Sequence, residues 1–388
     1  MALPLRRSPL PPFPLRHPRL AAALAMLLLL HPLGSGALLP RGSCSFVRRF
    51  ATTTALSLTP QSVLAQPVAS DANERVKTMK SLQAKKHREA LGLVLLEGHR
   101  QVIDALAAGH APAQVLVTER AALHAPLSAR LFDALSRAPA SSSVHSVTDA
   151  VMDKLADTVQ SQGVLASFPR PRPSLLPPTR SAAPHPSPLI LLLDRLADPG
   201  NVGTLLRSAF GLGADGVLLA GGCDAWSPKV LRSSMGVGLQ FPVVEAAWGG
   251  GGGGGGGEGG CEVVEVLRAA MVAAPTPSSS SAARWQVVLA VADPAAQPYT
   301  SCDLSRPTIL VIGSEADGIG PHAEGLSARL SKGPRQGQQG QQGQQGQEGE
   351  DSGCDCVRVQ IPTARRLESL NAAVAGTILL AEAARQRG

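Results

Sequence analysis

The stretch that decides the fold is LILLLDRLADPGNVGTLLR, residues 189–207. Its five leading apolar residues, Leu189–Leu193, predict a short buried strand, and the Pro-Gly pair further on predicts a turn. A helix is expected to open at Asn201, because apolar residues recur at helical spacing from Val202 onward. A buried strand that leads through a turn into a helix is the repeating unit of α/β proteins. The stretch therefore places this part of the chain in the α/β class.

The alternation of short apolar strands with helices continues through residues 189–388. Such alternation predicts a parallel sheet that is covered by helices on both faces. Strands are expected at Leu189–Leu193, Gly216–Leu219, Gln286–Val291, Thr308–Ile312 and Cys356–Gln360. Helices are expected near Val202–Leu212, Pro228–Met235, Glu262–Met271, His322–Leu330 and Ser369–Arg385.

A separate, smaller unit is expected at residues 71–168. The apolar run Leu91–Leu96 predicts a strand, and Gly98 predicts the turn that follows it. An amphipathic helix is expected at His99–Ala108, and a second strand at Gln114–Thr118. This alternation indicates a small α/β domain.

Three stretches of biased composition join or interrupt these units. Eight prolines fall between Phe168 and Pro188, so residues 169–188 are expected to be an extended linker that forms no core. The glycine run within 249–260 and the Gly/Gln tract within 333–353 have no apolar groups to bury. Both are predicted to be disordered surface loops, and we assign them no function.

Residues 1–70 are predicted to be an organellar targeting segment without a fold. They carry seven arginines but no lysine and no acidic residue, a composition typical of a transit peptide. The run Leu20–Leu30 is eleven apolar residues long, whereas a bilayer span needs about 20. Because this run also suits the core of a signal peptide, a mitochondrion and a chloroplast both stay open as destinations. We expect no membrane segment in the mature chain.

The net charge of +7 is no argument for nucleic-acid binding by the chain after the leader. Once the seven leader arginines are set aside, 29 of the 36 basic residues remain against 29 acidic ones. An aromatic content of 3% argues against base stacking as the main mode of binding. A local basic cluster is the remaining candidate, although a solvated helix face would look the same. Its members are Arg75, Lys77, Lys80, Lys85, Lys86, His87 and Arg88.

Two patterns typical of other function classes are excluded by their context. Residues 211–216 read G-x-G-x-x-G, but they follow a predicted helix and precede a predicted strand, the reverse of a dinucleotide-binding turn. A Rossmann oxidoreductase is therefore rejected. The six cysteines include no C-x-x-C pair, and Cys354 and Cys356 lie beside low-complexity sequence. We predict no metal site.

Polar groups gather at the carboxyl ends of predicted strands, where open α/β sheets bind ligands. In the opening stretch, Gly203 and Arg207 are four residues apart and share one helix face. A glycine inside a helix costs about 1 kcal/mol relative to alanine, so Gly203 is expected to admit a ligand or another backbone. An ordinary capped helix with a surface arginine explains the same residues.

Two further stretches have the same strand–loop–helix form. In GSEADGIG, residues 313–320, glycines let backbone groups approach a cofactor, although a plain tight turn would also suit. In VQIPTARRLESLNAAVA, residues 359–375, Pro362 ends a strand and a helix begins near Ser369. Ser369 and Asn371 are expected at the mouth of this helix, where either a polar ligand or a simple N-cap fits. The expected buried stripe is Leu370, Ala373, Val374, Ile378 and Ala381.

Together these stretches resemble the three motifs of the SpoU (TrmH-like) family of RNA ribose methyltransferases. Their cores read N-x-G-x-x-x-R at 201–207, G-S-E-x-x-G at 313–318 and I-P-x(6)-S-L-N at 361–371, in the family's order. Residues 75–168 are similar to that family's amino-terminal RNA-binding domain, whose fold is related to small ribosomal proteins. SLQxKKHRE at 81–89 and LEGxR at 96–100 carry this similarity.

The resemblance implies a SPOUT-type α/β fold with a C-terminal trefoil knot that holds S-adenosylmethionine, and a homodimer with shared active sites. It implies cofactor contacts, largely through backbone groups, at Gly313, Ile361 and Leu370. It implies a catalytic pocket lined by Asn201, Arg207, Glu315, Ser369 and Asn371. It implies RNA contacts at Lys85, Lys86, Arg88 and Arg100.

The implied activity is methyl transfer from S-adenosylmethionine to a ribose 2′-hydroxyl in structured RNA. Organellar ribosomal RNA is favoured over transfer RNA, because the two-domain arrangement resembles the ribosomal-RNA enzymes. The chain departs from the family at Arg365 and Arg366, where glycine is frequent. Two bulky cations there would narrow the cofactor pocket or add phosphate contacts. The alternative is a catalytically silent RNA-binding ribosome-assembly factor with the same fold.

Overall fold

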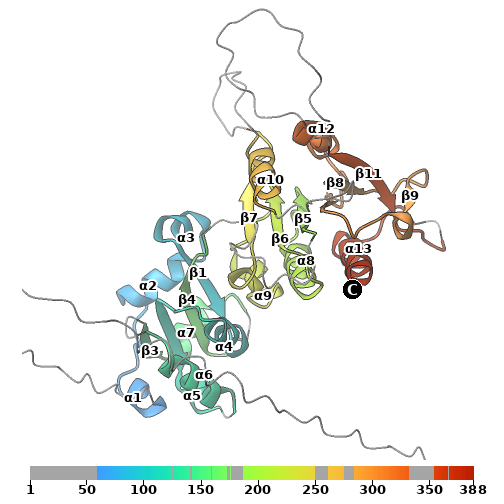
Figure 1. Cartoon of the computed structure of the whole chain (residues 1–388). Helices are drawn as coiled ribbons and strands as arrows, with labels where there is room; N and C mark the ends of the chain where they lie inside the picture. Colours follow the sequence, from blue (N-terminus) through green and yellow to red (C-terminus); the bar gives the residue numbers. More distant parts are fainter. Residues whose placement is uncertain are drawn as a thin grey trace, which may run out of the picture. The chain divides into compact units, whose positions relative to one another are not determined.

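The computed structural model in Figure 1 describes most of the chain from Thr59 onward. The described residues are 59–124, 126–139, 142–158, 160–172, 175, 187–249, 261–274, 284–331, 354–365 and 367–388. They belong to one compact unit, Leu56–Gly388. Most of the predicted leader, most of the proline-rich linker and nearly all of the two predicted inserts lie outside these residues.

The N-terminal part of this unit is a four-stranded mixed sheet with helices around it (Figure 1). Its strands are β1 Leu93–Glu97, β2 Gln114–Thr118, β3 Ser143–Val147 and β4 Val164–Pro169. Its helices are α1 Pro60–Leu64, α2 Glu74–Ser81, α3 Lys85–Leu91, α4 His99–Ala107, α5 Glu119–Leu123, α6 Leu127–Ser136 and α7 Asp149–Leu155. The strand order is β1-β4-β2-β3, in which β4 runs antiparallel to its two neighbours and β3 runs parallel to β2.

The predicted elements of this part lie close to their expected positions. Strand β2 has the predicted bounds, and α4 ends one residue earlier than expected. Strand β1 begins at Leu93 rather than at Leu91, because Leu91 is the last residue of α3. Gly92, with a φ of 62°, ends that helix in the left-handed conformation that glycine adopts without strain.

The end of the predicted leader is structured, which differs from the expectation for residues 1–70. Thr59 and Ser62 form a capping box at the start of α1, where Pro60 occupies the first turn. Val68 then pairs in parallel with Val147, and its N–H donates to the carbonyl of Ser146 over 2.8 Å. These backbone bonds attach residues 59–70 to the folded unit.

The C-terminal part is a seven-stranded sheet whose recorded pairs are all parallel. Its strands are β5 Leu189–Asp194, β6 Gly216–Ala220, β7 Val243–Ala246, β8 Gln286–Ala290, β9 Gln297–Pro298, β10 Thr308–Ile312 and β11 Asp355–Gln360, in the order β7-β6-β5-β10-β8-β11-β9. Its helices are α8 Pro199–Gly211, α9 Pro228–Ser233, α10 Glu262–Ala273, α11 Pro321–Glu324, α12 Leu326–Ser331 and α13 Ala372–Arg387, with 3₁₀ turns η2 Val237–Leu239 and η4 Tyr299–Ser301. The predicted α/β fold with a parallel sheet is confirmed.

The structure differs from the sequence expectations in a few elements. Strands β7 and β9 were not predicted, because they are only four and two residues long. The single helix expected at His322–Leu330 is two helices, α11 and α12, which meet at Gly325. Helix α13 begins at Ala372, three residues later than expected, because Asn371 and not Ser369 is its N-cap.

The later start of α13 also changes its buried face. Val374 and Ala381, two members of the predicted stripe, are exposed. The buried apolar residues of the helix are instead Ala372, Ala373, Gly376, Leu379, Leu380 and Ala383. A beta carbon at Gly376 would lie 2.4 Å from the Leu205 side chain, so this glycine allows α13 to lie close against α8.

Strand β5 is an interior strand of the sheet, between β6 and β10, and is buried along its whole length. Leu191 and its odd-numbered neighbours pack in the same core cluster as α8, and Leu192 packs in the cluster of α10. Helices therefore cover both faces, as the continuous apolar strand predicts. Leu175, within the linker predicted to form no core, is 5% exposed and packs in the second cluster. The linker expectation is wrong at this residue.

The two sheets are joined by a shared core and by charged contacts. Leu96 of β1 and Leu231 of α9 belong to one hydrophobic cluster. Arg88 donates a hydrogen bond to Asp224, and its side chain is 3% exposed in this ion pair. Arg170 donates to Glu245 over 2.8 Å, and its guanidinium lies 5.1 Å from the centre of the Trp226 ring. The residue Arg170, inside the predicted linker, therefore fixes the two parts to each other.

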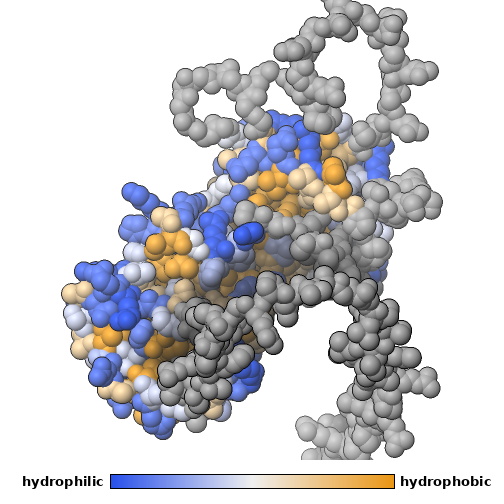
Figure 2. Space-filling model, turned by 60° about the vertical axis from the view of Figure 1, so that its left-hand side comes forward, coloured by the Kyte–Doolittle hydropathy of each residue, from blue (hydrophilic) through white to orange (hydrophobic). Residues whose placement is uncertain are grey.

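The surface combines hydrophilic residues with hydrophobic patches, which appear blue and orange in Figure 2. Within the described ranges, no helix is both long and apolar enough to cross a bilayer. Large apolar side chains that stand exposed are Leu91, Leu123, Phe210, Val272, Leu367 and Val374.

Candidate functional site

The three predicted motif loops leave the large sheet from the same edge. Ile312, the last residue of β10, is level with Leu193 of β5 on one side and with Ala290 of β8 on the other. Val359 of β11 is level with Ala290 as well. Because all these strands are parallel, the loops that follow β5, β10 and β11 start at the same edge of the sheet, with only β8 between the last two. Strand spacing places the ends of β10 and β11 roughly 10 Å apart.

The loop after β10 folds back tightly over its first glycine. Ser314 and Gly318 exchange two backbone hydrogen bonds of 3.0 Å, and Gly318 has a φ of 66°. A beta carbon on Gly313 would lie 2.3 Å from the Gly318 carbonyl carbon and 2.5 Å from the Ile319 nitrogen. Only a glycine fits at position 313 without moving the backbone.

Asp194 holds the far end of this loop, and sequence reasoning missed it. Its carboxylate accepts a hydrogen bond of 2.7 Å from the Gly320 N–H and one of 2.6 Å from the Trp248 indole N–H. The Asp194 side chain is 1% exposed. The signal in the sequence was an acidic residue at the end of a wholly apolar strand, since a buried carboxylate needs partners. Asp194 positions the loop from the neighbouring strand.

Three predicted catalytic residues from different motifs are joined by hydrogen bonds. The Asn371 side-chain N–H donates to the Asn201 side-chain oxygen over 3.1 Å. The Asn201 side-chain N–H in turn donates to the Glu315 carboxylate. We call Asn201, Glu315 and Asn371 the junction. It connects residues 170 positions apart in sequence and lies at the carboxyl edge of the sheet.

Each side chain of the junction has a local reason for its position. Asn201 lies in the first turn of α8, where its N–H donates over 2.8 Å to Asp198, the N-cap residue. Asn371 is the N-cap of α13, and its side-chain oxygen accepts hydrogen bonds from the N–H groups of Ala373 and Val374. The junction therefore uses two helix N-termini, whose dipoles favour a negative group such as Glu315.

Replacing Asn371 separates its capping role from its role in the junction. Asn371→Ala removes the helix cap and should lower the free energy of unfolding by about 1 kcal/mol. Asn371→Asp keeps an acceptor for the two N–H groups and should retain stability within about 0.5 kcal/mol. Neither variant can donate to Asn201, so both should lose most of the site's activity. Urea titrations alongside activity assays check this, and full activity of Asn371→Asp would contradict the role of the donor.

The other predicted residues of the third motif occupy less defined positions. Ile361 is half-buried against the larger core cluster, and Leu370 is half-buried just before the N-cap of α13. Ser369 is exposed two residues before that cap, so the expectation that the helix begins at Ser369 is wrong. Arg365 is exposed in the same loop, and Arg366 lies outside the described residues.

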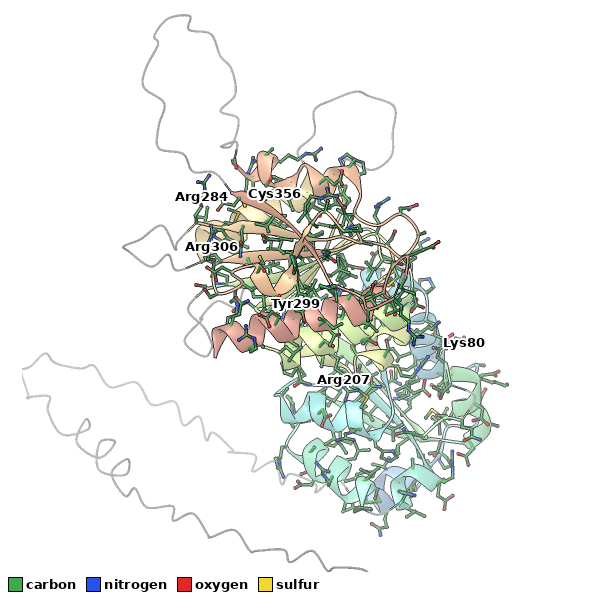
Figure 3. All side chains as sticks on the ribbon, turned by 90° about the vertical axis from the view of Figure 1, so that its right-hand side faces the viewer. Lys80, Arg207, Arg284, Tyr299, Arg306 and Cys356 are labelled. Carbon is green, nitrogen blue, oxygen red and sulfur yellow. The ribbon has the colours of Figure 1, made fainter. Side chains whose placement is uncertain are left out.

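Arg207 lies on α8 but does not reach the junction in this chain. It is six residues beyond Asn201, roughly 9 Å along the helix axis, and it is exposed. It lines a cavity of about 590 Å³ on the side of α8 that faces α4, the side seen in Figure 3. Gly203, its partner on the predicted face, is instead covered by α9, where a beta carbon would lie 1.9 Å from the Ser233 hydroxyl. The absence of a side chain at Gly203 therefore lets the backbone at the end of α9 approach α8.

The four predicted RNA-contacting residues fall into two groups. Lys85, Lys86 and Arg100 are exposed. Arg88 is 3% exposed, and its guanidinium donates to the carbonyls of Leu82 and Gln83 as well as to Asp224. The expectation that Arg88 contacts RNA is wrong, because a guanidinium buried among these partners has a structural role.

The described residues offer little for other kinds of chemistry. Within them, no group of three or more His, Cys, Asp or Glu side chains is arranged to hold a metal ion. Burial raises the pKa of the Cys223 thiol and of the Cys302 thiol to about 11. Both thiols are therefore protonated at neutral pH and are poor nucleophiles.

Two family models match the chain. Residues 73–166 match the model of an MRM3-like substrate binding domain, and residues 188–248 match that of the SpoU rRNA methylase family. The second match contains the first motif and ends shortly before the glycine run.

Curated relatives are similar over one or both parts. The mitochondrial rRNA methyltransferase 3 of Mus musculus is 37% identical over 167 residues, which are 43% of this chain and 38% of that protein. The chain therefore matches well under half of this relative's length. An uncharacterized tRNA/rRNA methyltransferase of Synechocystis is 30% identical over 323 residues, which are 82% of this chain and 94% of that protein.

Solved structures of the same kind superpose on most of the chain. One described as an RNA 2′-O ribose methyltransferase is 27% identical with a TM-score of 0.55, and it covers 83% of this chain and 99% of its own. The SpoU methyltransferase AviRb from Streptomyces viridochromogenes, solved with AdoMet, is 26% identical with a TM-score of 0.59 and covers 81% and 98%. The match to the Synechocystis protein along nearly its full length, together with the motif geometry, decides the family: the chain belongs to the SpoU family of RNA methyltransferases.

Proposed function

We propose that the chain transfers a methyl group from S-adenosylmethionine to a ribose 2′-hydroxyl of ribosomal RNA. The observation that carries this proposal is the junction, in which Asn201, Glu315 and Asn371 meet at the carboxyl edge of the parallel sheet. A set of polar groups fixed at this edge, beside glycine loops that expose backbone, suits a nucleoside cofactor and a polar acceptor. The AdoMet bound to AviRb and the similarity to an RNA 2′-O ribose methyltransferase support the same pairing of donor and acceptor.

The residues at the strand ends fit the cofactor. The loop folded over Gly313 leaves no room for a side chain, so only backbone groups face a ligand there. Ile361 and Leu370 are half-buried apolar residues that suit contact with an adenine ring. Bound there, S-adenosylmethionine supplies an electrophilic methyl group. Gly313, Ile361 and Leu370 hold and orient it, largely through backbone N–H and C=O groups.

Arg207 is the group that prepares the acceptor. A guanidinium has a pKa above about 12 and does not serve as a base at neutral pH. Arg207 instead orients the RNA phosphate and ribose and stabilises the negative charge that develops on the 2′-oxygen. The proton of the 2′-hydroxyl leaves through phosphate or solvent. Asn201 and Glu315 fix the floor of the pocket, and Ser369 stands exposed at its entrance.

A homodimer follows from the position of Arg207 in this proposal. Because Arg207 lies on α8 away from the junction of its own chain, a second copy is needed to place it beside the cofactor. Val374 on α13 is 48% exposed, an apolar side chain that a second copy would cover. The Ser208 and Thr377 hydroxyls are hydrogen-bonded over 2.9 Å and keep the two helices together as one surface.

The finer structural expectations are part of the same proposal. The segment 361–371 leads from β11, near one side edge of the sheet, to α13. That helix packs on α8, which lies against the other half of the sheet. We propose that this crossing closes the trefoil knot. The N-terminal part, with Lys85, Lys86 and Arg100 exposed, is proposed to be the RNA-binding domain related to small ribosomal proteins. We propose the domain bounds 71–168 and 189–388, with residues 59–70 attached to the former through the pairing of Val68 with Val147.

The cellular location and the RNA target are proposed from the composition of the leader and from the name of a similar protein. The acid-free, arginine-bearing leader is proposed to direct the chain to a mitochondrion or a chloroplast. The mouse relative is named a mitochondrial rRNA methyltransferase, which supports organellar ribosomal RNA over transfer RNA. The two glycine-rich inserts have no part in the proposal.

One assay tests the activity directly. Purified protein is incubated with methyl-labelled S-adenosylmethionine and an organellar large-subunit rRNA transcript, and the RNA is digested to nucleosides. The proposal predicts label in a 2′-O-methylnucleoside. Label on a base would contradict ribose methylation. Arg365, exposed in the cofactor loop, favours the second candidate, a silent RNA-binding assembly factor, which would bind the RNA and transfer no label.

A further inference from the structure

Two adjacent cavities lie along the boundary between α4 and the helices of the large sheet. The larger, of about 590 Å³, is lined by Arg100, Asp104, Arg207 and Gln240 among others. The smaller, of about 180 Å³, also contains Arg100 and is lined by Gln101, Arg232 and Met235. Arg100 and Met235 line both cavities, so the two are adjacent. We call them together the groove.

The larger cavity offers cations without acidic partners. Neither Arg100 nor Arg207 forms an ion pair or a side-chain hydrogen bond with any residue that the structure describes. By contrast, Arg232 lies 2.8 Å from Asp157 and 3.9 Å from Glu97 and is already neutralised. Two free guanidiniums at one cavity suit a phosphate, which they bind through paired N–H groups. Asp104 is near them and can accept from a hydroxyl or an amine.

The smaller cavity contains a buried polar group without a partner. Gln101 is 6% exposed, and its side-chain oxygen has no hydrogen bond among the described residues. A buried acceptor left unpaired is unfavourable and is rare in folded proteins. Gln101 is among the residues that line the cavity, and rotation about its last side-chain bond would turn an acceptor or a donor toward a ligand there.

The backbone at the groove is held in an uncommon conformation. Met235 has a φ of 59°, a left-handed value that bulky side chains rarely adopt, and Gly236 follows with 74°. This turn brings Met235 into both cavities and brings Gly236 to within 3.7 Å of the Gln101 side-chain oxygen, measured from the position of a beta carbon. Strained residues of this kind gather at ligand sites.

We propose that the groove binds one unpaired RNA nucleotide next to the target ribose and selects its base. The phosphate lies between Arg100 and Arg207, and the base enters the smaller cavity, where Gln101 pairs with its Watson–Crick edge. Unpaired bases are the usual means by which proteins read RNA sequence, since the grooves of an RNA duplex hide the base edges. The larger cavity is within the roughly 300–1,000 Å³ of ligand pockets. The inference rests on the proposed function and adds a base-selecting subsite to it.

The test uses the full chain and labelled oligoribonucleotides. Fluorescence anisotropy gives the Kd for single-stranded A12, U12 and C12 and for a hairpin of similar length, each over a range of KCl. One single-stranded sequence should bind at least about fivefold more tightly than the others, and the hairpin should bind most weakly. Arg100→Ala should weaken every single strand about tenfold and reduce the salt slope by about one, as loss of one phosphate contact does. Arg130→Ala, an exposed arginine of α6 away from the groove, is the matched control and should change neither.

Gln101→Leu tests base selection separately. It should reduce the preferred sequence to the affinity of the others while leaving the salt slope unchanged. It should also raise the melting temperature of the free protein by a few degrees, because it removes the unpaired buried oxygen. Unchanged sequence preference in Gln101→Leu, or equal binding by Arg100→Ala and the wild type, would overturn the proposal.

The proposed function can fail independently of the groove. Wild-type protein that neither binds S-adenosylmethionine nor labels rRNA would refute the function. Wild-type protein that labels rRNA, with groove variants that bind and label as it does, would refute only the groove. Both groove variants are expected to bind S-adenosylmethionine like the wild type, because the groove lies apart from the strand-end loops.

Discussion

Arg207→Ala is expected to lower the rate of methyl transfer by about 10³-fold while S-adenosylmethionine affinity stays within about twofold of the wild type. The side chain forms no hydrogen bond or ion pair with the junction of its own chain, and it lines the cavity on the side of α8 that faces α4. Its removal therefore leaves the loops after β10 and β11 intact and takes away the group that we propose stabilises charge on the 2′-oxygen. Single-turnover transfer of labelled methyl, with calorimetry on the same preparation, measures both quantities.

Two control variants show whether the effect of Arg207→Ala is specific to the guanidinium. Arg207→Lys keeps the charge but not the paired N–H groups, so it should retain an intermediate rate. Arg130→Ala removes an exposed arginine elsewhere and should leave the rate unchanged. A normal rate in Arg207→Ala would show that the guanidinium has no part in the reaction. A second measurement tests the proposed dimer. If two copies share the active site as proposed, Arg207→Ala mixed with Asn371→Ala should regain activity, because a mixed dimer then contains one intact site.

Asp224→Ala is expected to lower the free energy of unfolding by about 3 kcal/mol or more, the largest stability effect we predict. Arg88 is buried with Asp224 as its acidic partner, and it contacts only carbonyl groups otherwise. Removing the carboxylate leaves a buried positive charge without compensation. Urea denaturation followed by tryptophan fluorescence measures the change, and Trp226 lies close in sequence to report it.

A double variant separates the loss of the pair from the loss of one partner. Arg88→Met with Asp224→Leu removes both charges and keeps side chains of similar volume, so it should lie within about 1.5 kcal/mol of the wild type. A matched surface control is Asp133→Ala, which breaks an exposed pair with Arg137 and should change stability by less than about 1 kcal/mol. If Asp224→Ala behaved like Asp133→Ala, the contact between the two parts would not depend on this ion pair.

Local sequence signals predicted most of the large sheet. The apolar runs at Leu189–Leu193 and Thr308–Ile312 are long enough to be read as buried strands, and both are found at those bounds or within one residue. What could not be predicted depends on contacts across the chain. Arg88 looks like any surface cation of a basic cluster until Asp224, 136 residues away, is seen beside it. In the sequence, Leu175 reads as part of the proline-rich linker, and only the folded sheet shows that it packs in the core.

The candidate site was likewise predicted only in part. The motifs predicted Asn201, Glu315 and Asn371, and the hydrogen bonds join all three. The start of α13 was not predictable to the residue, because Ser369 and Asn371 are both good N-caps and the sequence does not show that Asn371 also bonds to Asn201. Asp194 was missed because its role is to hold a loop that follows a different strand.

The central claim is that one S-adenosylmethionine binds at the loops that surround Gly313. Calorimetric titration of the full chain with S-adenosylmethionine, beside Gly313→Ala and Gly325→Ala, tests it most directly. A beta carbon at Gly313 meets backbone at 2.3 Å, whereas at Gly325 its nearest neighbour is at an ordinary 3.5 Å. The account predicts one cofactor per chain in the wild type and in Gly325→Ala, and no measurable binding in Gly313→Ala. A wild-type chain indifferent to S-adenosylmethionine, or a Gly313→Ala chain that binds it equally well, would contradict the account.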